Sequence, residues 1–201
     1  MDELVFIILS QMTTSKSFGR VFDRLKVRTK DWSHVLRMPL RKLKALIGDA
    51  GLSHQKGPRI KAILKRLERD FGRVSLDALR RMPDDDVEAY LTSLPGVGVK
   101  TAKCVMMYSL GRRVLPVDTH VWRVARRLGF VSASVPYPEI HGALEVVVPP
   151  ADRYSFHVNA LSHGRKVCIA LRPRCRGCPL RRLCPYPLSH QTRLATGRPL
   201  A

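Results

Sequence analysis

A repeating pattern of apolar residues in the middle of the chain constrains the fold more than any other feature. Ile60, Ile63, Leu64, Leu67 and Phe71 recur at i, i+3, i+4, i+7 and i+11, which predicts an amphipathic helix over 58–71. Shorter apolar segments between glycines and prolines predict further helices, at 4–9, 18–25, 32–36, 40–47, 76–82, 87–94, 99–110 and 119–128.

Runs typical of strands are nearly absent. The two that occur, 114–117 and 146–148, are short and bounded by proline or glycine. We therefore expect an all-α protein without a sheet. Residues 187–201 have no core-forming pattern and are expected to form a loose tail. The chain opens directly on an apolar helix, which is equally compatible with a missing preceding segment and with a naturally short start.

The charge of the chain points to a polyanionic partner. The chain has 201 residues, of which 45% are hydrophobic, so it can bury a core. Its 36 Lys and Arg residues against 16 Asp and Glu residues give a formal net charge of +20, which favours nucleic acid as the partner. No apolar run approaches the roughly 18 residues that a membrane span needs, and the N-terminus lacks a secretory signature. Secreted and membrane-bound classes are therefore excluded.

A glycine-rich turn before a helix is the first candidate site. Residues 94–102 are Leu-Pro-Gly-Val-Gly-Val-Lys-Thr-Ala. Gly96 and Gly98 permit a tight turn whose backbone N–H groups, with the positive end of the next helix, suit one DNA phosphate. Lys100 lies in the first turn of that helix, where the macrodipole disfavours a cation. It is either a surface phosphate contact or an uncharged amine acting as a nucleophile.

Asp118 favours the second interpretation of Lys100. It precedes the predicted helix 119–128, where aspartate is a natural N-cap. The helix that carries Lys100 rises about 15 Å over ten residues, and residues 111–117 can return that distance if they are extended. Lys100 and Asp118 can therefore meet at one edge. A plain cap explains Asp118 but not its pairing with a lysine at a helix N-terminus.

Four of the five cysteines form one cluster near the end of the chain. Cys168, Cys175, Cys178 and Cys184 are spaced C-x6-C-x2-C-x5-C, with one short Cys-x2-Cys pair rather than the two of a typical structural zinc site. This spacing favours an iron–sulfur cluster over zinc, and zinc over disulfides. Cys104 lies at helical spacing with apolar neighbours and is expected in the core.

The strings at 94–102 and at 117–124 (Val-Asp-Thr-His-Val-Trp-Arg-Val) together resemble the helix-hairpin-helix and Gly/Pro-Asp signature of endonuclease III, a family of bifunctional DNA glycosylases. The resemblance runs over most of the chain, from about residue 4 to 186. It implies that Lys100 is the Schiff-base nucleophile and Asp118 the essential carboxylate.

The resemblance also implies an architecture. A six-helix barrel domain at 1–111 would contain the helix-hairpin-helix at 94–110, and a smaller helical domain at 112–186 would hold a [4Fe–4S] cluster on the four cysteines. A DNA-binding cleft would lie between the two domains. Arginines at 172, 174, 176, 181 and 182 stand within and beside the cysteine cluster and are expected to line a DNA backbone.

Further residues are implied to contact DNA through the same resemblance. Gln11 would enter the duplex, Leu52 would act as an apolar wedge, and His54 and Lys56 would lie near the backbone. The complete set of expected DNA contacts in the two strings and loops is Gln11, Leu52, His54, Gly96, Gly98, His120 and Arg123, of which the last two could instead support their own helix.

The implied function is excision of damaged, oxidised pyrimidines from duplex DNA, followed by β-elimination at the abasic site. We expect a monomer that binds double-stranded DNA with a damaged base or abasic site, in the cytoplasm and nucleoid of a prokaryotic cell. Thr92 stands where some members have a glutamate proposed to aid proton transfer, which leaves such a relay in doubt. Related mismatch glycosylases carry Ser or Tyr at the place of Lys100. The alternatives are such an enzyme without lyase activity and a non-catalytic DNA-binding module.

Overall fold

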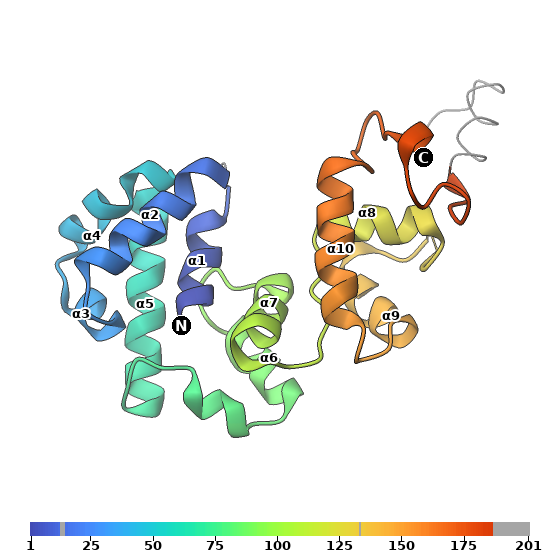
Figure 1. Ribbon diagram of the computed structural model, residues 1–201. Coiled ribbons are helices and arrows are strands. Elements are labelled where there is room, and N and C mark those ends of the chain that lie inside the picture. Colours follow the sequence, from blue (N-terminus) through green and yellow to red (C-terminus); the bar gives the residue numbers. More distant parts are fainter. Residues whose placement is uncertain (13–14, 133, 187–201) are drawn as a thin grey trace. The chain divides into compact units, whose positions relative to one another are not determined.

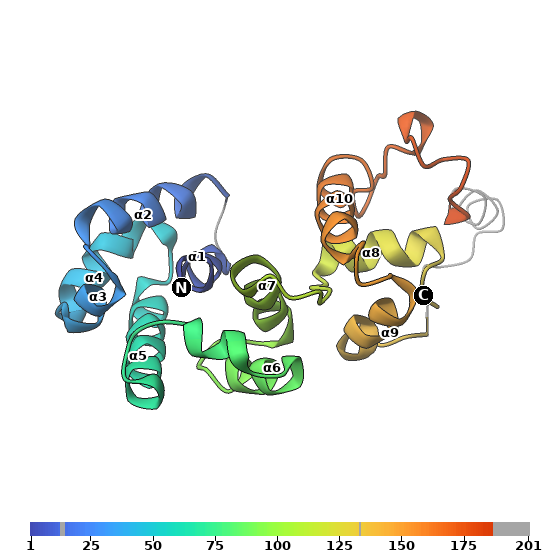
Figure 2. The same ribbon diagram turned by 60° about the horizontal axis from the view of Figure 1, so that its bottom comes forward.

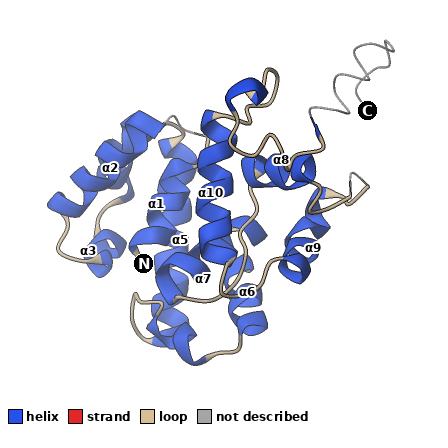
Figure 3. Cartoon of the chain, turned by 45° about the vertical axis from the view of Figure 1, so that its right-hand side comes forward, coloured by secondary structure: helices blue, strands red, loops and turns tan. Residues whose placement is uncertain are grey.

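The computed structural model contains helices and loops but no strand in the residues that it describes, which are 1–12, 15–132 and 134–186 (Figure 3). The all-α prediction is thus confirmed. No helix in those residues is long and apolar enough to cross a membrane. The predicted loose tail at 187–201 lies outside the described residues.

The chain folds as two compact units, Met1–Arg112 and Arg113–Ala201. This division lies next to the expected domain boundary between residues 111 and 112. The identities assigned to the two domains from the sequence, a barrel and a cluster domain, stay predictions.

Unit 1 is built from α-helices joined by short loops and two 3₁₀ turns, Gly48–Ala50 and Asp77–Arg81 (Figure 1). Its α-helices are α1 (Asp2–Ser10), α2 (Ser15–Arg28), α3 (Trp32–Arg37), α4 (Leu40–Ile47), α5 (Ser53–Phe71), α6 (Asp84–Thr92) and α7 (Val99–Leu110).

Helix α1 lies at the centre of unit 1 and packs against α2, α5 and α7 (Figure 2). Leu4, Ile8 and Leu9 on α1 are completely buried, as are Ile60 and Leu64 on α5. Burying side chains of this size stabilises a core by about 1.5–3 kcal/mol each. The apolar stripe that predicts α5 is therefore the same stripe that forms the core of unit 1.

Helix α5 begins at Ser53, five residues before the start predicted from Pro58. A proline inside a helix removes one N–H donor and usually breaks the helix. Here Pro58 lies within the first two turns of a 19-residue helix, so the remaining turns still bury their apolar side chains in the core. The extra N-terminal turns matter because they carry His54 and Lys56.

Unit 2 is built on α8 (Thr119–Leu128), α9 (Ile140–Val147) and α10 (Arg153–Lys166), with 3₁₀ turns at Tyr137–Glu139 and Cys175–Gly177. Helices α8 and α10 approach closely because α10 has Gly164 at the contact. A Cβ atom there would lie 3.0 Å from the Cβ of His120 on α8. The sequence did not predict α9 or α10, and the β-like residues Val146 and Val147 end helix α9.

Candidate active site

The helical hairpin is fixed by two apolar anchors that flank its glycines. Leu94 and Val97 are buried, whereas Gly96 and Gly98 are exposed. Gly96 has φ +77°, in the left-handed region that favours glycine. Gly98 is the N-cap of α7, and no side chain caps that helix. The N–H groups in the first turn of α7 therefore follow an exposed, extended residue and have no side-chain cap. N–H groups at a helix N-terminus in this arrangement bind phosphate in other proteins.

Two side chains from other elements contact the hairpin at Gly96. A Cβ atom at this position would come within 2.8 Å of the Cδ atom of Arg59 on α5, so the arginine crosses directly over the glycine. The Nε2 amide of Gln11, at the end of α1, donates to the carbonyl oxygen of Gly96 at 3.1 Å. Gln11 is therefore linked to the predicted phosphate-binding turn, a contact that the sequence did not predict.

Lys100 is half-buried in the first turn of α7, as the sequence predicted for its place in the chain. Glu3 on α1 lies in its electrostatic neighbourhood. Burial raises the pKa of the Glu3 carboxyl, and the positive charge of Lys100 offsets part of that increase. Glu3 is a site neighbour that sequence reasoning missed, because its only signal was its place at the start of an apolar helix.

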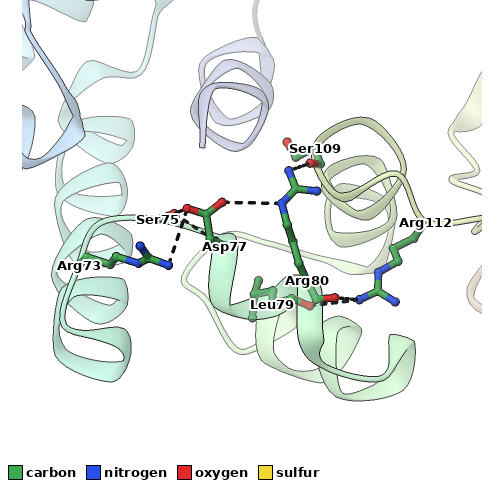
Figure 4. A network of polar contacts seen from close by, with 7 residues as sticks. All are labelled: Arg73, Ser75, Asp77, Leu79, Arg80, Ser109 and Arg112. Carbon is green, nitrogen blue, oxygen red and sulfur yellow. Dashed lines mark hydrogen bonds and ion pairs between the residues drawn. The ribbon is translucent and has the colours of Figure 1, made fainter.

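A polar network holds the C-terminal end of α7 against the 3₁₀ turn Asp77–Arg81 (Figure 4). Arg80 donates to the carbonyl oxygen of Ser109 at 2.8 Å and pairs with Asp77 at 3.7 Å. Arg112 donates to the carbonyl oxygens of Leu79 at 3.2 Å and Arg80 at 2.9 Å. These bonds fix the C-terminal end of α7. The N-terminal end of the same helix carries the hairpin and Lys100.

Two turns of unit 1 bear the residues expected to enter DNA. Gln11 ends α1, and Leu52 precedes α5 with a left-handed backbone, φ +51°. Leu52 is half-buried and His54 is exposed. Lys56 does not lie near a surface backbone contact as the sequence suggested. It is buried, 2% exposed, because its ammonium group bonds carbonyl oxygens inside unit 1.

Asp118 follows an extended segment that is bonded almost entirely by side chains from α9 and α10. The carboxylate of Glu145 accepts from the N–H of Leu115 at 2.7 Å. Nδ1 of His157 lies 2.7 Å from the carbonyl oxygen of Pro116, so the ring donates from that nitrogen. Arg153 donates to the carbonyl oxygen of Arg113 at 2.6 Å. The missed helices α9 and α10 are therefore the elements that position Asp118.

Asp118 is the N-cap of α8, as predicted. Its Oδ1 atom accepts from the N–H groups of His120 at 2.9 Å and Val121 at 2.8 Å, and the residue is half-buried. The hydroxyl of Tyr137 donates to the carbonyl oxygen of Val117 at 3.1 Å. Burial, and then the charge of Asp118, raise the pKa of Tyr137, so this phenol is a close neighbour of the carboxylate. Nothing in the sequence singled out Tyr137.

Arg123 is engaged inside unit 2. Its guanidinium donates to the carbonyl oxygens of Cys168 and Gly164, both at 2.8 Å, and lies 3.0 Å from Nδ1 of His120. The sequence left two roles open for His120 and Arg123, DNA contact and support of their own helix. The contacts found here support the helix and the neighbouring loop. Their contact with DNA stays a prediction.

The four clustered cysteines line one cavity, together with Val124, Leu128 and His163. All four are free thiols of intermediate burial, and Cys104 is a separate buried thiol, as predicted. Burial raises the pKa of the Cys184 thiol, and the charges of the other three cysteines raise it further. The four sulfurs are therefore close enough to influence one another.

The four thiols are soft ligands of the kind that an iron–sulfur cluster or a zinc ion takes. Among the described residues, no three His, Cys, Asp or Glu side chains form a group that could hold a metal ion. A mononuclear zinc site would need its sulfurs within about 2.3 Å of one point, whereas a [4Fe–4S] cluster needs four thiolates around a larger body. Arg127 also donates to the sulfur of Cys168 at 3.3 Å and to the carbonyl oxygen of Ile169 at 2.9 Å. This guanidinium therefore supplies an N–H donor to one of the four sulfurs.

Lys100 and Asp118 lie in different units, so their predicted pairing stays a prediction. Within unit 1 the structure brings Lys100 into the neighbourhood of Glu3, and Gln11 to the hairpin. Within unit 2 it brings Asp118, His120 and Tyr137 into one neighbourhood. The five exposed arginines at 172, 174, 176, 181 and 182 stay candidates for DNA contact.

Residues 5–150 match the family model described as HhH-GPD superfamily base excision DNA repair protein. Endonuclease III of Bacillus subtilis is 34% identical over 181 residues, which cover 90% of this chain and 78% of the relative. DNA glycosylase/AP lyase ROS1 of Arabidopsis thaliana is 30% identical over 179 residues, 80% of this chain and 13% of the relative. The chain spans 57% of the length of another Arabidopsis thaliana protein with DNA glycosylase in its name, to which it is 36% identical.

Solved structures show the same fold. A trapped endonuclease III–DNA covalent intermediate superposes with a TM-score of 0.79 at 30% identity, covering 94% of this chain and 84% of that one. A thermostable thymine-DNA glycosylase superposes with a TM-score of 0.80 at 24% identity, over 94% of this chain and 84% of that chain.

Proposed function

The chain belongs to the endonuclease III-like branch of the HhH-GPD superfamily of base excision DNA repair proteins, and from this premise we propose that it is a DNA glycosylase with AP lyase activity. We propose duplex DNA with an oxidised pyrimidine or an abasic site as its substrate. The observation that carries the proposal is a half-buried lysine in the first turn of the helix that follows the glycine hairpin. A non-catalytic hairpin needs no amine at that position.

In the proposed reaction the Nζ amine of Lys100 attacks C1′ of an extruded nucleotide. The bond from C1′ to the base breaks, and the base leaves with the electron pair and takes up a proton. The amine then loses one proton and O4′ takes one up as the C1′–O4′ bond opens, which gives an iminium at C1′ and a hydroxyl at C4′. Removal of a proton from C2′ then expels the 3′ phosphate by cleavage of the C3′–O bond, and water releases the lysine. Lys100 is thus the group that would distinguish a lyase from a hydrolytic glycosylase.

Asp118 is proposed to stabilise the positive charge that develops on the sugar and to assist proton transfer. Its Oδ1 atom is occupied by two N–H donors of α8, which hold the carboxylate in one orientation. The contact between Tyr137 and the backbone before Asp118 supports the same orientation.

Cys168, Cys175, Cys178 and Cys184 are proposed to hold a [4Fe–4S] cluster. The cluster would fix the cysteine segment, and with it the exposed arginines proposed to contact the phosphate backbone. The support for this assignment is the shared cavity and the bond from Arg127 to the sulfur of Cys168. The chain's own residues therefore provide four soft ligands and one N–H donor.

Borohydride trapping tests the proposal. The wild-type protein, incubated with an abasic duplex and borohydride, is expected to give a covalent protein–DNA adduct, because borohydride reduces the imine. Lys100→Gln should abolish the adduct while retaining binding. Lys65→Gln, which changes an exposed lysine on α5, is the matched control and should trap like the wild type. Absence of an adduct with the wild type would contradict the lyase.

The substrate is tested with a duplex panel that carries thymine glycol, 5-hydroxycytosine, uracil, 8-oxoguanine, 5-methylcytosine or an abasic site. Oxidised pyrimidines should be excised and nicked without added alkali. Excision that needs alkali for strand breakage would indicate a glycosylase without lyase activity. Binding with steep salt dependence and no scission of any duplex would indicate a DNA-binding module.

A further inference from the structure

We propose that Lys56 is a positioning residue that joins two turns of unit 1, so that Met12 and Leu52 project together as a two-part apolar wedge into the base stack. This inference rests on the proposed function, because it needs a duplex with an extruded or missing base. Sequence reasoning selected Gln11 and Leu52 for this task and placed Lys56 at the DNA backbone. The structure instead buries Lys56 and exposes Met12, the residue that follows Gln11.

Lys56 bonds the ends of two helical elements. Its Nζ donates to the carbonyl oxygen of Leu9 at 2.7 Å and to that of Ala50 at 2.8 Å. Leu9 is in the last turn of α1, and Ala50 ends the 3₁₀ turn that precedes α5. Carbonyls in the last turn of a helix lack partners in the helix and attract a cation. One buried ammonium group therefore holds together two chain ends that are far apart in the sequence.

Each of these two ends leads directly into an unusual backbone conformation. Met12 and Leu52 are the non-glycine residues with positive φ among the described residues, at +50° and +51°. This region is sparsely populated by residues with side chains, and such residues gather at functional sites when the surrounding structure holds them there. The anchor for each is close, since Leu9 precedes Met12 by three residues and Ala50 precedes Leu52 by two.

Both strained residues are apolar, and Met12 is 89% exposed. An exposed methionine in a strained conformation has no role in the core of unit 1. Apolar side chains such as methionine and leucine insert between base steps in proteins that kink or open DNA. Gln11, by contrast, donates to the carbonyl oxygen of Gly96, so its side chain ties the same turn to the hairpin. The turn that carries Met12 is thus fixed on one side by Lys56 and on the other by the hairpin.

The test uses a duplex with a tetrahydrofuran abasic analogue, which lacks the C1′ hydroxyl and cannot form an imine. A 2-aminopurine opposite the analogue reports unstacking by its fluorescence. The measured quantity is the ratio of the Kd for undamaged duplex to the Kd for the analogue duplex. Met12→Ala and Leu52→Ala should each lower this ratio by about tenfold, the loss that removal of one buried apolar contact produces.

Lys56→Met, which keeps the length of the side chain and removes its donor, should lower the ratio at least as much as either alanine variant. If Lys56 acts through Met12, then adding Met12→Ala to Lys56→Met should change the ratio by less than about twofold, because the two are coupled. Additive effects would overturn the positioning role. Met12→Ala removes only exposed atoms, so the wedge stays testable even if Lys56→Met does not fold.

Two matched controls separate positioning from general stability. Lys61, on the same helix, donates to the carbonyl oxygens of Leu36 and Met38 at the end of α3. Lys61→Met should therefore destabilise unit 1 similarly and leave the Kd ratio unchanged. Val27, which is 84% exposed on α2, gives Val27→Ala as the control for loss of an exposed apolar side chain.

The outcomes distinguish this inference from the proposed function. A wild-type protein that traps with borohydride but binds both duplexes equally overturns the wedge and leaves the lyase intact. A protein that discriminates through Met12 and Leu52 but forms no adduct contradicts the lyase and supports the wedge. A Lys56→Met effect no larger than that of Lys61→Met would reduce Lys56 to a structural residue.

Discussion

The hairpin region of unit 1 and the cysteine segment of unit 2 show two ways to hold a functional loop. In the hairpin, Leu94 and Val97 are buried, and most of α7 from Thr101 onward is buried as well. In the cysteine segment, no residue from 165 to 186 is buried. The hairpin is supported by apolar packing, whereas the cysteine segment depends on polar anchors and, as proposed, on its bound cluster.

The comparison shows what holds the functional groups of each region in position. A packed hairpin can present its N–H groups and Lys100 with no ligand bound, because hydrophobic burial stabilises it. The cysteine segment buries too little of its apolar surface for that. Arg123 and Arg127 instead bond the carbonyl oxygens of Cys168, Ile169 and Ala170, and thereby fix only its start. Three predictions test this difference between the two regions, and a fourth tests the buried amine of Lys56.

The largest effect is expected from Cys178→Ser. Loss of one of the four proposed cluster ligands should abolish the brown colour expected of the protein and expose the cysteine segment to proteolysis, while α7 stays protected. Visible absorbance and mass spectrometry of limited digests measure both. Cys104→Ala, which changes the buried thiol of α7, should keep the colour. A colourless Cys104→Ala variant, or a wild type without colour, would contradict the proposed ligand set.

Arg127→Met should destabilise unit 2 by about 2 to 3 kcal/mol, because its guanidinium makes charge-assisted bonds to main-chain oxygens and to the sulfur of Cys168. Urea unfolding followed by Trp122 fluorescence, in a Trp32→Phe background, measures the loss in this unit. Arg126→Met is the control. Arg126 stacks 4.9 Å from the ring of Trp122, a contact worth about 1 kcal/mol or less. Equal losses of stability in the two variants would contradict the proposal that Arg127 anchors the cysteine segment.

Gly96→Ala should destabilise the hairpin by about 1 to 2 kcal/mol, because an alanine with φ +77° is strained and its Cβ meets Arg59. Trp32 fluorescence in a Trp122→Phe background follows unit 1. Gly98→Ala is the matched control, since Gly98 has an extended backbone and nothing lies within 4 Å of its Cβ position. A Gly98→Ala variant that loses as much stability would show that the strained turn is not the critical feature.

The smallest effect is a dependence of stability on pH. Burial lowers the pKa of Lys56 below its ordinary value of 10.5. Between the lowered pKa and 10.5 the unfolded chain binds more protons than the folded one, so the free energy of unfolding should rise with pH through that window. The slope should be lost in Lys56→Met. Urea unfolding of both proteins across alkaline pH measures it, and identical slopes would contradict the burial of the amine.

Several elements were predictable because a local pattern is sufficient to define them. The stripe from Ile60 to Phe71 predicts α5, and the two glycines before Lys100 predict the turn and α7. Asp118 was predicted as a cap because aspartate at that position bonds the next N–H groups. The shared cavity of the four cysteines agrees with their spacing in the chain.

Other features escaped prediction for physical reasons. Helix α10 mixes histidine, aromatic and polar residues without a clear apolar stripe, and α9 ends in valines that favour strands. Their formation depends on packing around the segment before Asp118 rather than on local propensity. The prediction that Lys56 lies near the DNA backbone was wrong because a lysine is usually exposed. The burial of this lysine requires carbonyl oxygens from two separate elements, which the sequence does not reveal.

The sequence by itself determined the helices of unit 1, the hairpin, the N-cap at Asp118 and the cysteine spacing, because each depends on residues that lie near one another in the chain. Only the tertiary structure decided that Lys56 joins α1 to the turn before α5, and that Arg127 reaches Cys168. Such contacts join residues more than 40 positions apart, or residues on separate elements. They follow from how helices pack, which no local pattern records.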